Sequence, residues 1–125
     1  MLPPRRTRGV STAREALVAQ CLACASLESG VNAHAWHEIA RRPGRDVLDA
    51  IARLLGALLA VAGAPGAKER RALALCVMAR QTLAAAPVSD PTVLNALLAP
   101  LSALRNWPLP TGAVASEMER AVLRE

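Results

Sequence analysis

Aromatic side chains are nearly absent from this chain of 125 residues. It has no Phe and no Tyr, and Trp36 and Trp107 are its only aromatic residues. Val and Ile, which favour strands, are scattered and form no alternating run between turn signals. Hydrophobic residues still make up 53% of the chain, and most are Ala and Leu, which lead the helix-propensity scale. The composition therefore predicts an all-α fold.

The sequence also lacks an uncharged segment long enough to cross a membrane. One of the two longest lies between Arg53 and Lys68 and contains the turn residues 63–66, whereas a membrane helix needs roughly 20 apolar residues. The apolar run 16–25 follows several arginines, as in a signal peptide, but Gln20 interrupts it. We interpret this run as part of an ordinary helix and expect no membrane span.

Cysteine is too scarce for a disulfide framework. The number of cysteines is odd, and all three lie in apolar segments that are expected to be helical: Cys21, Cys24 and Cys76. We therefore expect reduced thiols and a cytoplasmic location.

Two of these cysteines could be metal ligands together with the two histidines of the chain. Cys21 and Cys24 are followed by His34 and His37. Two Cys and two His suit a tetrahedral zinc site. In a hairpin of two helices, however, Cys21 and His34 would lie roughly 9 Å apart along the axis, at 1.5 Å per residue. A small Cys2His2 zinc-binding protein is therefore the second alternative, and we expect no metal site.

Turn and cap residues divide the chain into five to six helical segments. Helices are expected at about 12–29, 33–42, 47–62, 67–86, 91–105 and 113–125. The first, third and fourth are long and the others short, which predicts a compact all-α bundle. Residues 11–125 form its single helical domain, and residues 1–10 are expected to be a mobile basic arm.

Polar residues and prolines predict how these helices begin and end. Thr12 and Glu15 have the spacing of a capping box. Pro100 is expected to kink or split the fifth helix, and residues 106–110 should be extended because of their prolines. The expected N-caps are Asn32, Asp46 and Asp90.

The third predicted helix is apolar nearly all round, because Leu54 lies off the face that includes Leu58. Such a helix is either central in the bundle or part of an oligomer interface. Trp36 and Trp107 are either core fillers or interface residues. We expect a non-enzymatic interaction module (a regulator, adaptor, antiactivator or chaperone-like protein) that binds another protein and self-associates as a dimer. Leu54, Leu58, Trp36 and Trp107 are its expected contact residues.

Arginine supplies nearly all of the positive charge. Lys68 is the only lysine, and the net charge is +5. The charge alone does not select a partner, because GC-rich coding sequences also raise the arginine content. Arginine clusters nevertheless suit salt-sensitive, sequence-independent phosphate contacts, so nucleic-acid binding is the first alternative. The candidate residues are Arg5, Arg6, Arg8, Arg41, Arg42 and Arg45.

Motifs of common enzyme classes are missing. The sequence has no Gly-rich phosphate loop, no HExxH and no G-x-S-x-G. Asp46 and Asp49 are explained by a favourable interaction with the helix dipole near the start of the third helix. We expect no enzyme and no cofactor.

Overall fold

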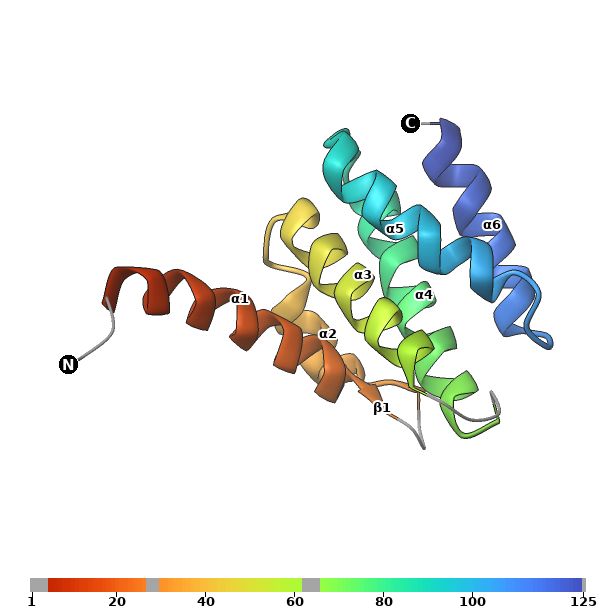
Figure 1. Ribbon diagram of the computed structural model, residues 1–125, viewed down its shortest axis with the longest axis horizontal. Coiled ribbons are helices and arrows are strands. Elements are labelled where there is room, and N and C mark those ends of the chain that lie inside the picture. Colours follow the sequence, from red (N-terminus) through yellow and green to blue (C-terminus); the bar gives the residue numbers. More distant parts are fainter. Residues whose placement is uncertain (1–4, 27–29, 62–65, 125) are drawn as a thin grey trace.

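Helices dominate the computed structural model, which describes residues 5–26, 30–61 and 66–124 (Figure 1). Its elements are α1 (Arg5–Cys24), β1 (Ala25–Ser26), β2 (Gly30–Val31), α2 (Ala33–Ile39), α3 (Gly44–Ala60), α4 (Gly66–Ala85), α5 (Pro91–Leu104) and α6 (Thr111–Arg124). The all-α class and the bundle of six helices are confirmed, and α1, α3 and α4 are its long members. Among the described helices, none combines the length and the apolar composition that spanning a membrane requires.

The centre of the bundle is α3, which packs against α1, α4 and α5. In Figure 1, α1 lies at one end of the molecule and α6 at the other, with α3, α4 and α5 between them. Leu48, Ile51 and Leu55 of α3 are fully buried. Much of the apolar surface of α3 is therefore covered within the chain, as expected of a central helix, whereas Leu58 and Leu59 are only partly buried. Leu54 is only 9% exposed.

The corner after α1 differs from the sequence prediction, which extended this helix to about residue 29. The helix ends at Cys24, and β1 pairs antiparallel with β2 in the register Ala25–Val31 and Ser26–Gly30. Arg71 of α4 donates from Nε to the carbonyl oxygen of Ala25 at 2.9 Å. Strand pairing and this tertiary hydrogen bond satisfy backbone groups that a longer helix would otherwise use.

The start of α1 also differs, because the helix begins at Arg5 rather than near Thr12. Thr12 lies inside the helix, so the predicted capping box is wrong. The predicted mobile arm falls partly outside the described residues, at 1–4, and residues 5–10 have helical backbone. Figure 1 shows this first part of α1 extending beyond the rest of the bundle.

Two of the three predicted N-caps are confirmed. The side chain of Asn32 accepts a hydrogen bond from the backbone N of Ala35, and that of Asp90 accepts one from Thr92. Asp46 is not a cap, because α3 already begins at Gly44, directly after Pro43. Pro43 fixes its own φ near the helical value and allows this earlier start.

The prolines near the C-terminal end act differently from the prediction. Pro100 lies inside α5 without splitting it, and its ring is buried in the core. Burial of apolar surface offsets the backbone hydrogen bond that the proline removes. Residues 105–110 form turns rather than an extended segment, with the backbone N of Trp107 donating to Leu104 at 2.9 Å.

Candidate functional site

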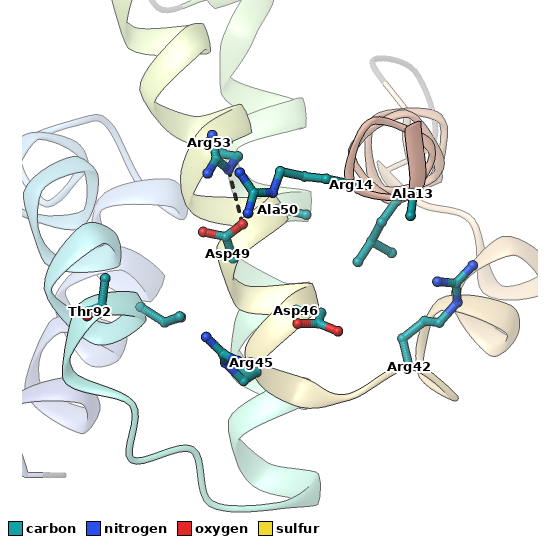
Figure 2. A pocket seen from close by; sticks show the side chains of 11 residues that line it. Ala13, Arg14, Arg42, Arg45, Asp46, Asp49, Ala50, Arg53 and Thr92 are labelled. Atoms are coloured by element: carbon teal, nitrogen blue, oxygen red, sulfur yellow. Dashed lines mark hydrogen bonds and ion pairs between the residues drawn. The ribbon is translucent and has the colours of Figure 1, made fainter. Parts of the chain in front are cut away.

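A charged cleft of about 460 Å³ lies between α1, α3 and α5 (Figure 2). Arg14 reaches it from α1, and Arg42 reaches it from the turn before α3. Thr92 and Val93 of α5 close the opposite side. The charged lining consists of Arg14, Arg42, Arg45, Arg53, Asp46 and Asp49. Arginines outnumber aspartates two to one, so the cleft favours an anion.

Helical spacing places three of these charges in one row. Arg45, Asp49 and Arg53 are four residues apart along α3, and side chains at this spacing share one face of a helix. The row therefore alternates positive, negative and positive charge along the cleft.

Two of the arginines in the cleft already have acidic partners. Arg53 Nε lies 3.0 Å from Asp49 Oδ2, as the dashed line in Figure 2 shows. Arg45 Nη2 lies 2.9 Å from Asp90 Oδ2. Both arginine side chains are about half exposed or more, and ion pairs at such positions contribute little to stability. Their guanidinium groups therefore keep donors that an anion can use.

The other two arginines are free within the described part of the chain. The guanidinium groups of Arg14 and Arg42 have no hydrogen-bond or ion-pair partner among the described residues. A guanidinium group carries five N–H donors in a planar fork that matches carboxylate and phosphate oxygens. Arg14 and Arg42 therefore supply donors from two different elements to the same cleft.

The floor of the cleft is apolar. Leu17 of α1, Ala50 of α3 and Val93 of α5 line it and are almost fully buried. The arginines stand around this floor with their charged ends accessible to water. Each contact with an anion is thus partly screened, and tight binding would need several arginines at once.

The predicted nucleic-acid-binding residues are only partly brought together. Arg42 and Arg45 line the cleft. Arg41 is exposed, and its Nη1 lies 3.9 Å from Oε2 of Glu38 on α2. Arg5, Arg6 and Arg8 belong to the first turns of α1, the helix that supplies Arg14.

Sequence reasoning missed Arg14 and Arg53 as members of this site. The spacing of Arg53 from Arg45 was a usable signal, because both lie on one face of a helix. No sequence pattern could place Arg14 there, since its position depends on the packing of α1 against α3.

The predicted protein-binding residues do not gather on one exposed surface. Leu54 is buried, and Leu58, Trp36 and Trp107 are partly buried and pack against the core. Trp36 comes from α2, the two leucines from α3, and Trp107 from the connection between α5 and α6. Much of the side-chain surface of these residues is therefore already in contact with the core and is not accessible to a partner.

The four candidate ligands of the zinc-binding alternative differ in burial. Cys21 and Cys24 are fully buried, whereas His34 and His37 are exposed. Nowhere in residues 5–26, 30–61 and 66–124 do three or more His, Cys, Asp or Glu residues form a group that could hold a metal ion. Burial, together with the neighbouring Cys24, raises the pKa of Cys21 to about 11, which keeps its thiol protonated at neutral pH.

Comparison with known proteins identifies no relative of this chain. No family model matches it, and no curated protein or solved structure matches it. The chemistry of the cleft is therefore the main guide to function.

Proposed function

We propose that the protein is a non-enzymatic nucleic-acid-binding protein that holds the phosphate backbone in the cleft between α1, α3 and α5. The observation that carries this proposal is the pair Arg14 and Arg42. These two guanidinium groups have no partner among the described residues, and they line one cleft from different elements. Arginine binds the oxygens of a phosphate in a bidentate manner, as it does those of a carboxylate.

The distribution of arginine favours a polyanion over a single small anion. Arg5, Arg6 and Arg8 lie upstream of Arg14 on the same helix. At 1.5 Å per residue, the stretch from Arg5 to Arg14 covers roughly 14 Å. A nucleic-acid strand carries one charge per roughly 3.4 Å of helix axis, so a stretch of this length spans several phosphates. The net charge of +5 adds a general attraction.

The hypothesis of a protein partner or a dimer through an apolar helical face has less support. Neighbouring helices pack against α3. Among the residues whose burial the structure describes, the exposed large apolar ones lie far apart in the sequence and are Leu22, Val61, Leu109 and Leu123. A cytoplasmic location remains our expectation, and the three free, buried thiols agree with it.

A salt series of binding measurements tests the proposal. Fluorescence anisotropy of a labelled oligonucleotide is recorded for the full chain and for Arg14→Gln and Arg42→Gln. Each phosphate contact contributes roughly 0.7 to 0.9 to the slope of log K against log salt. Each variant should therefore bind several-fold more weakly and show a slope smaller by about one contact.

The matched control is Arg124→Gln, which removes the same charge from α6, outside the cleft lining. It should change the affinity much less than the two cleft variants do. Equal losses for Arg124→Gln and Arg42→Gln would show general charge attraction instead of a site. Binding that does not depend on salt would overturn the proposal altogether.

A further inference from the structure

A second, smaller cavity adjoins the arginine cleft. It has a volume of about 160 Å³ and lies between α2, the start of α3 and the end of α4. Arg42 lines both cavities, so the two share this residue. We call this cavity the Trp36 pocket, and its walls include Trp36, Ala40, Val47, Gln81, Thr82 and Ala85.

The chemistry of the Trp36 pocket differs from that of the cleft. Trp36 lines this pocket and packs against the core, and the residue is only partly buried. Ala40, Val47 and Ala85 give the walls an apolar character. The hydroxyl of Thr82 is occupied, because it donates to the carbonyl oxygen of Met78 at 2.8 Å.

One polar group of the pocket is available to a ligand. Gln81 is exposed, and its amide has no hydrogen-bond partner within the described residues. An amide both donates and accepts hydrogen bonds, as the edge of a nucleobase requires. The pocket thus combines an aromatic residue, an amide without a partner among the described residues and an arginine that it shares with the cleft.

The size of the pocket limits what it can hold. Its volume of about 160 Å³ lies well below the roughly 300–1,000 Å³ of sites for drug-sized ligands. One small planar group fits this description better than a helix or a strand of a partner protein. Its position beside Arg42 further favours a group attached to a phosphate.

We infer that the Trp36 pocket receives one unpaired base of a nucleic-acid strand, stacked on Trp36, while Arg42 binds the adjoining phosphate. This inference rests on the proposed nucleic-acid binding and specifies the ligand as single-stranded. In a duplex the base is stacked on its neighbours, whereas an unpaired base is free to stack on an aromatic side chain. Stacking is open to every base, so it gives affinity without sequence preference.

The test compares three probes on the full chain: an unmodified single-stranded oligonucleotide, a strand of equal length with abasic sites, and the duplex. The abasic strand keeps every phosphate but removes the bases. We expect the unmodified strand to bind about tenfold more tightly than the abasic strand, the typical effect of one stacked base. The duplex should bind like the abasic strand.

Variants of the pocket separate stacking from charge. Trp36→Leu keeps an apolar side chain in the core and should abolish the preference for bases while leaving the salt slope unchanged. Trp36→Phe keeps an aromatic face and should retain most of that preference. Arg42→Gln should weaken binding of all three probes and reduce the salt slope. Circular dichroism and thermal melting show that each variant is folded.

The outcomes distinguish this inference from the proposed function. Salt-dependent binding that requires Arg42 but is equal for the unmodified and abasic strands overturns the stacking inference alone. The absence of binding to any strand overturns both. Each strand is tested both as DNA and as RNA. The inference is supported for the type of nucleic acid whose unmodified strand binds more tightly than its abasic strand, provided that Trp36→Leu loses this difference.

Discussion

Asp90 binds Arg45 with one carboxylate oxygen and caps α5 with the other. Its Oδ2 lies 2.9 Å from Nη2 of Arg45, and its Oδ1 accepts a hydrogen bond of 3.0 Å from the backbone N of Thr92. The start of α3 is thereby tied to the start of α5, beside the arginine cleft. The same contact partly neutralises Arg45, which distinguishes it from the free Arg14 and Arg42.

The first prediction separates these two roles of Asp90. Asp90→Asn keeps an oxygen that can cap α5 but removes the negative charge next to Arg45. We expect stability close to that of the parent and oligonucleotide binding that is tighter by a few-fold, because Arg45 is released to contact phosphate. Anisotropy titrations at low and moderate salt measure this gain, which should shrink as salt rises.

Asp90→Ala is the comparison for this prediction. It removes both the charge and the cap, so it should gain affinity like the asparagine variant but lose about 1 kcal/mol of stability. Weaker binding in Asp90→Asn would show that the ion pair positions Arg45 for the ligand instead of competing with it.

Local patterns predicted the helices better than the places where they meet. The boundaries of α4 and α5 agree with the sequence to within one residue, because Pro87, Asp90 and Pro91 act on their own neighbours. The end of α1 was wrong because Arg71, far along the chain, bonds to the backbone at Ala25. A residue 46 positions away leaves no local signal.

The site was predictable only in part for the same reason. Arg42 and Arg45 stood out as a cluster in the sequence, and the structure places both in the cleft. Arg14 joins them only through the packing of α1 on α3. The apolar surface of α3 was recognised, but the sequence could not decide between a central helix and an interface, since both bury the same side chains.

The second prediction concerns the junction of α5 and α6. Glu119 accepts hydrogen bonds from the hydroxyl of Ser102 and from Arg105, the latter at 3.1 Å. The bond from Ser102 lowers the pKa of Glu119, burial opposes this, and the charge and hydrogen bond of Arg105 lower it further. A carboxylate with a lowered pKa stabilises the fold above its ordinary value of 4.5 and loses that contribution as the pH falls through the folded value.

Glu119→Gln should therefore melt at a lower temperature than the parent at pH 7, and the difference should shrink as the pH falls below 4.5. Thermal unfolding followed by circular dichroism across this range measures it. Glu117→Gln is the control, since Glu117 is 51% exposed and pairs with Arg80 at 3.3 Å. Its effect should be smaller. A melting difference for Glu119→Gln that stays constant with pH would contradict the assigned role.

The third prediction concerns the cysteines. Cys21, Cys24 and Cys76 are fully buried, and burial raises the pKa of Cys76 to about 12. A thiol with a pKa near 11, such as Cys21, is ionised to about one part in a thousand at pH 8. None of the three should react with a thiol reagent in the native protein, and all should react in denaturant.

Ser89→Cys supplies a positive control for this measurement, because Ser89 is exposed on the connection before α5. It should add one thiol that reacts at once in the folded state. Rapid native labelling of Cys21 or Cys24, located by mass spectrometry, would show that the corner between α1 and α2 opens in solution.

The last prediction uses two glycines in opposite surroundings. A Cβ on Gly112, in the first turn of α6, would lie 2.2 Å from the carbonyl oxygen of Trp107 and 2.9 Å from that of Arg105. These are backbone atoms, so the connection between α5 and α6 would have to move. A Cβ on Gly56, within α3, meets nothing within 4 Å.

Gly112→Ala should therefore lose roughly 1–3 kcal/mol of stability, the usual cost of overpacking, whereas Gly56→Ala should gain about 0.5–1 kcal/mol by restricting the unfolded chain. Urea unfolding monitored by circular dichroism gives both values. Neither glycine lines the arginine cleft or the Trp36 pocket, so folded Gly56→Ala should bind oligonucleotides like the parent. A stable Gly112→Ala protein would mean that residues 105–110 adapt freely, and that the partial burial of Trp107 does not hold the start of α6 in place.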